Sequence, residues 1–375
     1  MTADIDSDSS DTLVIGAGTL GMMTALRLAQ RGVEVTVLDS GAPMEEASGV
    51  NAGSLAAQNK MRALMPHTLA ALALWRQMSE FLGADVGFAN VGGLRVATSD
   101  SDLALLAQSS DEQSKLGVDI EWLDGAALAQ RAPFIGKDVL AATYSSVDCY
   151  ASPLLFTPAL LRTAEAAGVR VHSRLRVVAV ARSGTVYRVE TEGGRVFRCG
   201  RLIIAAGAWS GSIARLMGVE IPVALDVNMI SVSGPATSFM HGVVTHVQGI
   251  LTLKQVANGT CLIGGGWQGA GSLESGRKDI DYESSLHNVR LAIRVIPHIR
   301  ELTLVRQWAG FEGVSPDSCP YLGALPNHPN AYMLACARGG WTLSPILSQM
   351  LSELMLDRDT SLPYRNFSPA RFCDA

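Results

Sequence analysis

A glycine-rich segment near the N-terminus has the residue types and spacing that phosphate binding needs. Gly16-Ala17-Gly18-Thr19-Leu20-Gly21 follows an apolar stretch at 12–15 and precedes an amphipathic stretch that runs to about Arg31. A turn of this kind between a strand and a helix directs backbone N–H groups and the positive end of the helix dipole at a pyrophosphate. Asp39 closes the next apolar stretch and can accept hydrogen bonds from a ribose 2′-hydroxyl. The pattern therefore predicts a dinucleotide site on a βαβ unit.

Two later segments of small residues indicate which dinucleotide is bound. Ala205-Ala206-Gly207-Ala208-Trp209 ends an apolar strand, and Arg338-Gly339-Gly340-Trp341 precedes a helix predicted over 344–356. Glycines allow the backbone to approach a ligand, and Ser344-Pro345 suit the first turn of a helix. A helix that begins there would direct its positive end at the flavin edge where negative charge accumulates on reduction. A nicotinamide dinucleotide would not need this third segment, although an ordinary packing helix is the alternative.

The order of predicted elements places these segments in one discontinuous domain. Strands are predicted at 12–15, 201–206 and 331–337, whereas residues 81–149 and 216–319 carry short alternating strands with helices at 100–116 and 282–296. The predicted fold class is α/β (α+β), with a Rossmann-like dinucleotide-binding domain into which a β-sheet substrate domain is inserted in two pieces. The nucleotide-binding domain comprises 1–80, 150–215 and 320–375, and the substrate domain comprises 81–149 and 216–319.

Composition excludes several other classes of protein. The 375 residues are 48% hydrophobic with a net charge of −5, which gives no electrostatic field for nucleic acid. The sequence contains no apolar run near the ~20 residues that span a bilayer. Residues 1–11 are acidic and are expected to form a frayed tail of a cytoplasmic protein. The six cysteines lack C-x-x-C spacing and the seven histidines lack metal-site spacing, so neither a metal nor an iron–sulfur cluster is expected.

Five motifs in the same order carry a resemblance to a known family. They are the N-terminal fingerprint, Ala47-Ser48-Gly49-Val50-Asn51-Ala52-Gly53-Ser54, Ala206-Gly207-Ala208-Trp209-Ser210, Trp308-x-Gly310 with Pro316-Asp317 and Pro320-x-x-Gly323, and Arg338-Gly339-Gly340-Trp341 with Leu343-Ser344-Pro345. Together they resemble the D-amino-acid-oxidase-type FAD-dependent amine oxidoreductases over nearly the whole chain. Arg338 departs from the histidine that this family usually has in the last turn.

The resemblance implies noncovalently bound FAD with residues 48–55 beside the isoalloxazine and Val177 or Val178 beside the adenine. The implied FAD contacts are Gly16, Gly18, Thr19, Leu20, Gly21, Asp39, Ser40, Ser48, Asn51, Ala52, Gly53, Ser54, Leu55, Val177, Val178, Ala206, Gly207, Trp209, Gly310, Arg338, Gly339, Gly340, Trp341, Thr342 and Leu343.

Within this family, residues 249–255 and 264–269, together with the 47–54 segment, resemble the β subunits of opine oxidases or dehydrogenases and the related hydroxyproline and proline dehydrogenases. The implied reaction oxidises the secondary amine of an opine or similar amino acid to an imine, which hydrolyses to an amino acid and an oxo acid. The implied partners are a larger α subunit with further redox cofactors and, in some relatives, a small iron–sulfur subunit.

Two departures from the family bear on the substrate. Glu312 lies near the place where glycine oxidases carry an arginine that binds the substrate carboxylate, which favours a substrate with a cationic arm. The strand at 261–266 lacks the lysine that promotes oxygen reaction in single-chain sarcosine oxidases, which favours a dehydrogenase. Candidate substrate-binding residues are Lys254, Glu312, Arg338, Trp267, Trp308 and Tyr150, and a surface position on its strand is the alternative for Lys254. No general base is assigned, because an amine that enters neutral can transfer hydride directly.

Two other functions fit the same residues. One is a stand-alone oxidase of sarcosine, proline or a D-amino acid, which would form peroxide rapidly. The other is a noncatalytic assembly subunit that retains FAD structurally. A nicotinamide-linked dehydrogenase fits least well, because it leaves the last glycine turn and its helix unexplained.

Overall fold

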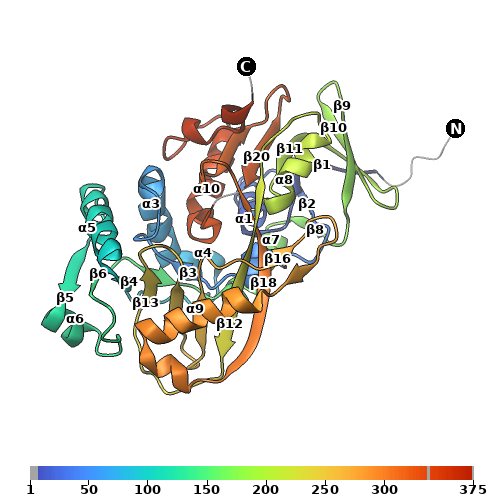
Figure 1. The fold of residues 1–375 in the computed structure, drawn as a ribbon. Coiled ribbons are helices and arrows are strands. Elements are labelled where there is room, and N and C mark those ends of the chain that lie inside the picture. Colours follow the sequence, from blue (N-terminus) through green and yellow to red (C-terminus); the bar gives the residue numbers. More distant parts are fainter. Residues whose placement is uncertain (1–6, 336–337, 374–375) are drawn as a thin grey trace.

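The computed structural model describes residues 7–335 and 338–373, which form two large sheets and the helices around them (Figure 1). The first sheet has the order β19-β20-β11-β1-β2-β8, and the hairpin of β9 and β10 extends from β11. Its strands are β1 (Ser7–Ile15), β2 (Val35–Leu38), β8 (Arg170–His172), β9 (Val177–Ser183), β10 (Val186–Thr191), β11 (Val196–Ile204), β19 (Tyr321–Ala324) and β20 (Ala331–Ala335). Parallel pairing of β1 with both β2 and β11 gives the dinucleotide-type centre of this sheet.

Helices from both ends of the chain cover one face of the first sheet. They are α1 (Thr19–Ala29), α3 (Met65–Arg76), α4 (Met78–Leu82), α7 (Pro153–Ala166) and α10 (Gly340–Met355). Their apolar side chains share one buried cluster with Val14 and Ile203 of the sheet. The short α8 (Ser210–Arg215) packs on the other face, against Leu202 and Ile204.

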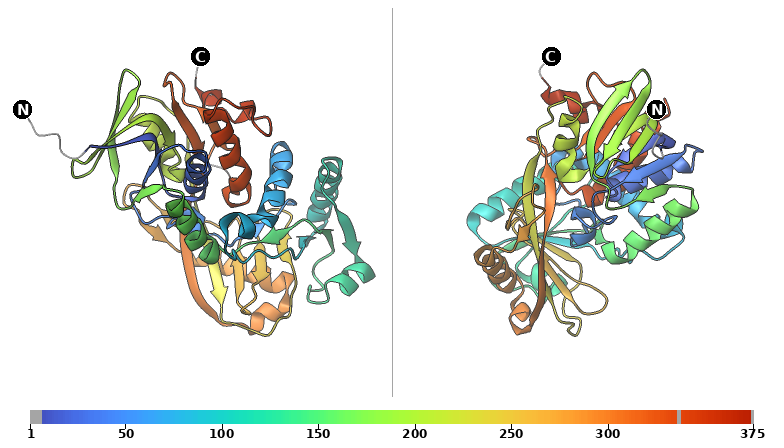
Figure 2. Two further views of the ribbon diagram at one scale, coloured as in Figure 1. Left: turned by 180° about the vertical axis from the view of Figure 1, so that it is seen from behind. Right: turned by 90° about the vertical axis from the view of Figure 1, so that its right-hand side faces the viewer.

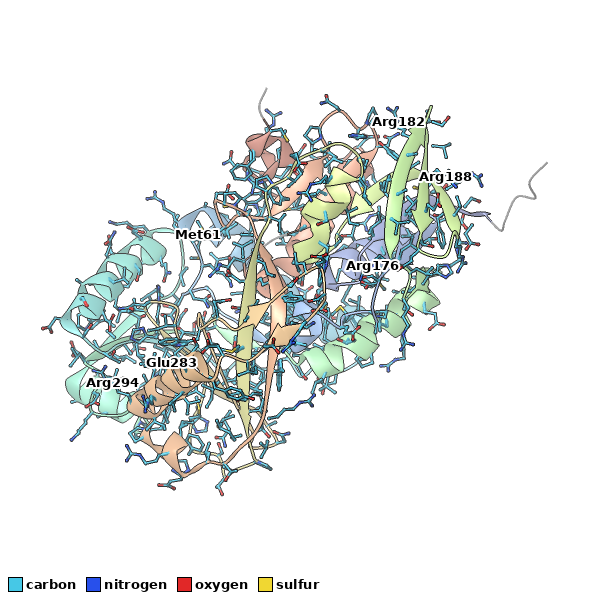
Figure 3. The ribbon with its side chains drawn as sticks, turned by 45° about the vertical axis from the view of Figure 1, so that its right-hand side comes forward. Met61, Arg176, Arg182, Arg188, Glu283 and Arg294 are labelled. Carbon is cyan, nitrogen blue, oxygen red and sulfur yellow. The ribbon has the colours of Figure 1, made fainter. Side chains whose placement is uncertain are left out.

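The second sheet has the order β18-β12-β15-β14-β13-β4-β6-β5 and lies beside the first (Figure 2). Its strands are β4 (Gly93–Ala97), β5 (Glu121–Asp124), β6 (Ala141–Ser145), β12 (Ala224–Ser233), β13 (Val243–His246), β14 (Thr252–Gln255), β15 (Cys261–Gly264) and β18 (Leu304–Val314). Leu253 and Ile263 pack against Ala292 and Val295 of α9 (Tyr282–Val295), so this helix covers one face of the sheet. Glu283 and Arg294 lie on the outer side of α9 (Figure 3).

The remaining elements are one 16-residue helix and several short segments. They are α2 (Ala47–Val50), α5 (Asp100–Lys115), α6 (Gly125–Arg131), β3 (Ser54–Leu55), β7 (Cys149–Tyr150), β16 (Ala270–Gly271), β17 (Lys278–Asp279), and 3₁₀ turns at Arg62–Leu64, Gly207–Trp209, Pro297–Glu301, Arg365–Phe367 and Pro369–Phe372. No helix in the described part of the chain is both long and apolar enough to cross a bilayer.

Sheet membership supports the predicted domain division, which stays a prediction. Every strand of the second sheet falls within 81–149 or 216–319, and every strand of the first falls within the other three segments. The helices predicted at 100–116 and 282–296 are confirmed as α5 and α9. The α/β fold class is confirmed.

The prediction of a frayed N-terminal tail is wrong for residues 7–11, and residues 1–6 lie outside the described part. Strand β1 begins at Ser7 and pairs with β11 from Val196 onward. Asp8 forms an ion pair with Arg195, which directly precedes β11. At least one acidic residue of the predicted tail therefore pairs with a cation of the fold instead of being solvated.

The last helix also begins earlier than predicted. Helix α10 starts at Gly340, so Pro345 lies inside the helix rather than in its first turn. Proline cannot donate the N–H that would bond the carbonyl oxygen of Trp341. The hydroxyl of Ser344 donates to that oxygen at 2.9 Å instead, which explains how the helix continues through the proline. Strand β20 ends at Ala335, and the predicted extension to 337 lies outside the described residues.

Candidate FAD and amine site

The glycine fingerprint forms the tight turn that the sequence predicts. Gly16 has a φ of 114°, and a Cβ there would lie 2.3 Å from the carbonyl oxygen of Ala205. A Cβ at Gly21 would lie 2.0 Å from the carbonyl oxygen of Gly16, so the third glycine lets α1 pack against the strand end. Because α1 begins after Gly18, which has no side chain to cap it, its N-terminus can accept a phosphate.

Asp39 and Ser48 hold the same turn from two sides. The carboxylate of Asp39 accepts hydrogen bonds from the backbone N–H groups of Ala17 at 2.6 Å and Gly41 at 2.8 Å. The hydroxyl of Ser48 accepts one from the N–H of Thr19 at 2.9 Å. Burial raises the pKa of Asp39 while these two backbone bonds act against that rise. The carboxylate thus fixes the turn and retains lone pairs for a ribose.

The segment at 47–55, which we call the flavin loop, is organised by its own polar side chain. The amide of Asn51 donates to the carbonyl oxygen of Ser48 at 2.7 Å and accepts from the N–H of Gly53 at 2.7 Å. Gly53 has a φ of 76°, and a Cβ there would lie 2.1 Å from the carbonyl oxygen of Ala151. Asn51 and Gly53 therefore give the loop one defined path between the two sheets.

Strand β18 of the second sheet packs directly on the flavin loop. The indole N–H of Trp308 donates to the carbonyl oxygen of Val50 at 2.7 Å. A Cβ at Gly310 would lie 2.3 Å from Cγ2 of Val50, so a larger residue there would force the Val50 side chain or the loop to shift. The structure thus brings Trp308 and Gly310 to the loop.

Lys254 reaches the same loop from β14. Its side chain is buried, and its Nζ donates to the carbonyl oxygen of Ala52 and to Ser54 Oγ, the latter at 3.2 Å. The ring centroid of Tyr150 lies 5.3 Å from the Nζ. Burial lowers the pKa of Lys254 to about 7. The alternative of a surface strand residue is therefore wrong.

The N-terminus of α10 lies on the other side of the loop. The hydroxyl of Thr342 approaches the carbonyl oxygen of Ser54 at 3.5 Å, and Trp75 donates to the carbonyl oxygen of Thr342 at 2.9 Å. Trp341 packs against Trp75 with ring centroids 5.0 Å apart, so its ring belongs to the core beneath the turn.

A cation that the sequence motifs do not include lies against this turn. Gly339 has a φ of 73°, and a Cβ there would lie 2.1 Å from Nζ of Lys60. Desolvation lowers the pKa of Lys60, and the charge of Glu312 opposes that effect. Lys60 follows the flavin loop within a few residues, but nothing in the local sequence shows that it meets the last glycine turn.

Glu312 and Arg338 both have partners within the protein. The carboxylate of Glu312 accepts from Asn228 Nδ2 at 2.6 Å and from the N–H of Gly339 at 3.3 Å. Arg338, whose side chain is 52% exposed, forms an ion pair with Asp226. Strands β12 and β18 pair Asp226 with Glu312, so two acidic residues lie opposite each other at this edge, and Arg338 pairs with the first of them.

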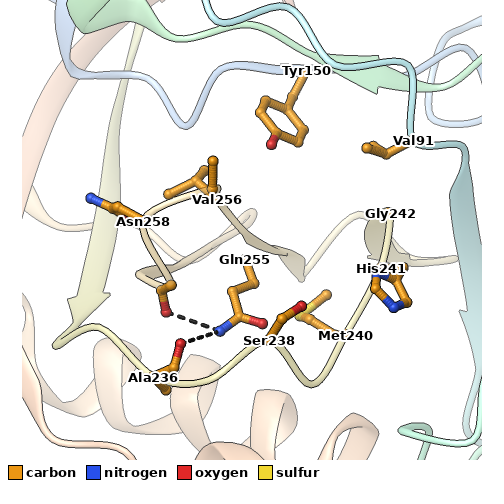
Figure 4. Close-up of a pocket in the computed structure, with 12 residues that line it drawn as sticks. Val91, Tyr150, Ala236, Ser238, Met240, His241, Gly242, Gln255, Val256 and Asn258 are labelled. Atoms are coloured by element: carbon orange, nitrogen blue, oxygen red, sulfur yellow. Dashed lines mark hydrogen bonds between the residues drawn. The ribbon is translucent and has the colours of Figure 1, made fainter.

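A pocket of about 350 Å³ opens next to Tyr150 (Figure 4). Its walls come from the β12–β13 connection, the β14–β15 turn and β7, and include Ser238, His241, Val256 and Asn258. The amide of Gln255 donates to the carbonyl oxygens of Ala236 at 3.2 Å and Gly259 at 3.0 Å, which ties two of these walls together. Tyr150 contacts both the pocket and Lys254.

A buried polar network that sequence reasoning missed attaches the end of the flavin loop to the second sheet. Asp148 accepts from the N–H of Ala57 at 2.6 Å and from Gln58 Nε2 at 3.1 Å. Gln58 accepts from the hydroxyl of Thr143 at 2.7 Å, and its carbonyl oxygen accepts from Arg95 at 2.7 Å. Burial raises the pKa of Asp148 to about 6. These residues share no spacing motif, so only the fold brings them together.

The other predicted site residues are more dispersed. The ring of Trp267 stacks on His287 of α9 at 5.4 Å, on the helix-covered side of the second sheet, so the structure does not bring it to the loop. Val177 is buried at the start of β9 and Val178 is exposed. Trp209 follows Ala206 and Gly207 and donates to the carbonyl oxygen of Leu273 at 3.2 Å. Residues 7–335 and 338–373 contain no cluster of three metal-ligating side chains.

Comparisons with known proteins identify the family of this chain. Residues 11–354 match the DAO family, described as FAD dependent oxidoreductase. Glycine oxidase of Pseudomonas putida is 26% identical over 96% of this chain and 98% of its own length. An opine oxidase subunit of Rhizobium meliloti is 24% identical over 96% of this chain and 97% of its own.

The solved structures agree on the fold. The crystal structure of glycine oxidase from Geobacillus kaustophilus superposes with a TM-score of 0.91 at 22% identity, over 98% of this chain and all of the other. The tight turn at Gly16, the close packing at Gly21 and the start of α1 after Gly18, which has no side chain, are the features that a dinucleotide's pyrophosphate requires. The chain therefore belongs to the DAO family of FAD-dependent oxidoreductases and is an enzyme of amine or amino-acid oxidation.

Proposed function

We propose that this enzyme oxidises the secondary amine of an opine or a similar N-substituted amino acid, as the catalytic β subunit of a dehydrogenase complex. The observation that carries the proposal is the pocket of about 350 Å³ lined by Tyr150, because the ring of Tyr150 also lies 5.3 Å from Nζ of Lys254, which contacts the flavin loop. Glycine would leave that space unfilled, whereas the second substituent of an opine nitrogen would occupy it. The polar side chains of Ser238, His241 and Asn258 suit a charged or hydrogen-bonding substituent.

The charges at the opposite edge support a substrate with more than one charged group. Glu312 lies where the resemblance places a carboxylate-binding arginine, and it is held by Asn228 and Gly339 rather than turned to solvent. Lys254 and Arg338 are the candidate partners of a substrate carboxylate, although Arg338 already pairs with Asp226. An opine with a cationic arm matches this mixed arrangement better than glycine does.

The cofactor would be held noncovalently by the contacts that the sequence predicts. Its pyrophosphate would lie at the start of α1 near Gly18 and Thr19, and Asp39 would accept from the ribose. The flavin loop and the N-terminus of α10 would flank the isoalloxazine. When bound, FAD supplies the hydride acceptor.

The protein's own residues then orient the amine and exclude water. Trp308, Val50 and Gly310 close one side through the contact between β18 and the loop. The oxidised product is an imine, which takes up water and splits into an amino acid and an oxo acid.

The proposal includes partners. The similarity to an opine oxidase subunit supports assembly with a second, larger subunit that carries further redox cofactors, and the proposal extends to a small iron–sulfur subunit as the third member. A cytoplasmic location stays a prediction. The runner-up function is a stand-alone oxidase of sarcosine, proline or a D-amino acid, which the similarity to glycine oxidase favours.

The test is anaerobic reduction of the purified FAD-loaded chain by octopine, nopaline, sarcosine, proline and D-alanine, followed by admission of air. The proposal expects an opine to bleach the flavin absorbance and air to restore it slowly. Bleaching by sarcosine, proline or D-alanine with rapid reoxidation contradicts the proposal in favour of the oxidase. Stable flavin that none of these amines reduces contradicts it in favour of an assembly subunit.

A further inference from the structure

Amine oxidation by hydride transfer requires a neutral amine. A substrate that arrives as an ammonium ion must therefore first give its extra proton to some acceptor in the site. An alkyl ammonium group has a pKa of about 10, so a secondary amine arrives at neutral pH carrying an extra proton. The nitrogen lone pair must be free before it can form the C=N bond as the hydride leaves. A side chain next to the reacting nitrogen that is itself uncharged near pH 7 would meet this need.

Lys254 lies on the face of the second sheet that meets the flavin loop. It pairs directly with Leu262 of β15, so both side chains are on the same face, opposite the one that Leu253 and Ile263 turn to α9. Its Nζ contacts the loop at Ala52 and Ser54. The ring of Tyr150, which lines the pocket of about 350 Å³, has its centroid 5.3 Å from this nitrogen. Lys254 therefore contacts the proposed flavin site and lies near one residue that lines the proposed substrate pocket.

The surroundings of Lys254 do not stabilise a positive charge. Within the described residues no acidic side chain contributes to its pKa, and burial alone lowers that pKa to about 7. Its hydrogen-bond partners are a carbonyl oxygen and a hydroxyl, both neutral. A lysine whose task was to hold a permanent charge would be expected to have a carboxylate partner, as Lys278 has in Glu46 at 2.6 Å.

The two titratable groups of β7 do not ionise near pH 7. Tyr150 of β7 has a phenol pKa raised by burial, and Cys149 of the same strand has a thiol pKa of about 12. His246 of β13 turns to Asp102 at 3.3 Å rather than to the loop. Leu262 is the cross-strand neighbour on β15. Asp148, which directly precedes β7 and has a pKa raised to about 6, and Lys60, whose pKa burial lowers, also lie just beyond the flavin loop. A midpoint near pH 7 is therefore assigned to Lys254 only if substitution of Lys254 removes it.

We propose that Lys254 accepts the proton of the substrate's ammonium group and so delivers the amine in its reactive form. This inference rests on the proposed function and gives Lys254 the role of proton acceptor rather than carboxylate partner. An ammonium N–H bond breaks and an N–H bond to Nζ forms. The nitrogen lone pair is then free to form the C=N bond as the Cα–H bond breaks, and bound FAD would supply the acceptor for that hydrogen and its electron pair. The proton leaves Lys254 to solvent after the product departs.

The experiment compares two variants that separate a proton acceptor from a carboxylate partner. Lys254→Met keeps the length of the side chain without charge or basicity, and Lys254→Arg keeps the charge without a usable neutral form. Each is purified with FAD and mixed anaerobically with the amine that reduces the wild type. The rate constant of flavin bleaching and the apparent Kd of the amine are measured between pH 6 and 10. The visible spectrum of the bound flavin is titrated over the same range without amine.

For the wild type, the flavin spectrum should shift with a midpoint near pH 7, and the bleaching rate should rise through the same midpoint. Both variants should lose the spectral midpoint and bleach about 100-fold more slowly at pH 7.5. The rate of Lys254→Met should recover toward pH 10, where the amine itself is neutral, with little change in Kd.

Two results would overturn the inference while leaving amine oxidation standing. One is a Lys254→Arg variant that keeps the wild-type rate and Kd while Lys254→Met weakens Kd, which identifies a carboxylate partner. The other is a spectral titration without a midpoint near pH 7 in the wild type. Failure of every amine to bleach the wild type would instead contradict the proposed function, and the proton-acceptor role with it.

Discussion

Gly310 of β18 faces Val50 of the flavin loop so closely that a Cβ at Gly310 would lie 2.3 Å from Val50 Cγ2. This contact joins the second sheet to the loop that is proposed to flank the isoalloxazine. The adjacent hydrogen bond from Trp308 to the carbonyl oxygen of Val50 fixes the same junction. The position of the loop is therefore set by both sheets.

Gly310→Ala is expected to displace the loop, because overpacking of this kind costs about 1–3 kcal/mol. The variant should fold, and its Kd for FAD should be at least about 10-fold higher than that of the wild type, as measured by flavin fluorescence on dilution. Val50→Ala combined with Gly310→Ala restores the space and should recover most of the affinity. Equal FAD affinity in Gly310→Ala and the wild type would show that the contact does not position the loop.

Ser344→Ala is expected to destabilise α10, because Pro345 leaves the carbonyl oxygen of Trp341 dependent on the Ser344 hydroxyl. Loss of a buried hydrogen-bond partner costs about 1–3 kcal/mol. The measurement is urea unfolding followed by circular dichroism. In a Pro345→Ala background, the new N–H can bond the same oxygen, so Ser344→Ala should cost much less there. An identical cost in both backgrounds would contradict this explanation.

Asp148 is expected to give the protein a pH-dependent stability. Its pKa is raised to about 6 in the folded protein, above the ordinary value of about 3.9, so the folded state binds this proton more tightly than the unfolded state. The contribution of Asp148 is fully present below about pH 4 and is lost as the pH rises through 6, by about 2–3 kcal/mol.

Thermal unfolding of wild type and Asp148→Asn between pH 4 and pH 7 checks this sign. The wild type should lose stability relative to the variant as the pH rises through that window. The quantity compared is the change in stability between pH 4 and pH 7 within each protein. The pH-independent cost of placing an amide instead of a carboxylate beside Gln58 therefore cancels. Parallel pH curves for the two proteins would show that Asp148 is not the group responsible.

Local motifs predicted the cofactor turn well, because the residues that form the turn are close together in the sequence. Gly16 needs its positive φ, and a Cβ at Gly21 would lie only 2.0 Å from a backbone oxygen. Both positions therefore require glycine, and the glycine spacing alone identifies this turn. The start of α10 was less predictable, since proline usually marks a first turn and here Ser344 compensates for it inside the helix.

The substrate side depended on long-range pairing that local patterns do not encode. A lysine in an apolar strand suggests exposure, and only the pairing of Lys254 with Leu262 places its side chain toward the flavin loop. Lys60 meets Gly339 across most of the chain length, and Asp148 meets Gln58 although 90 positions separate them in the sequence. The strand at 261–264 carries no lysine, but the neighbouring strand supplies one on the same face.

The most direct test of the account is anaerobic mixing of the FAD-loaded chain with an opine while the flavin absorbance is followed. The account predicts that octopine or nopaline bleaches the flavin, that sarcosine, proline and D-alanine bleach it far more slowly, and that air restores the absorbance slowly. Fast bleaching by sarcosine, proline or D-alanine with immediate reoxidation, or no bleaching by an opine, would contradict it.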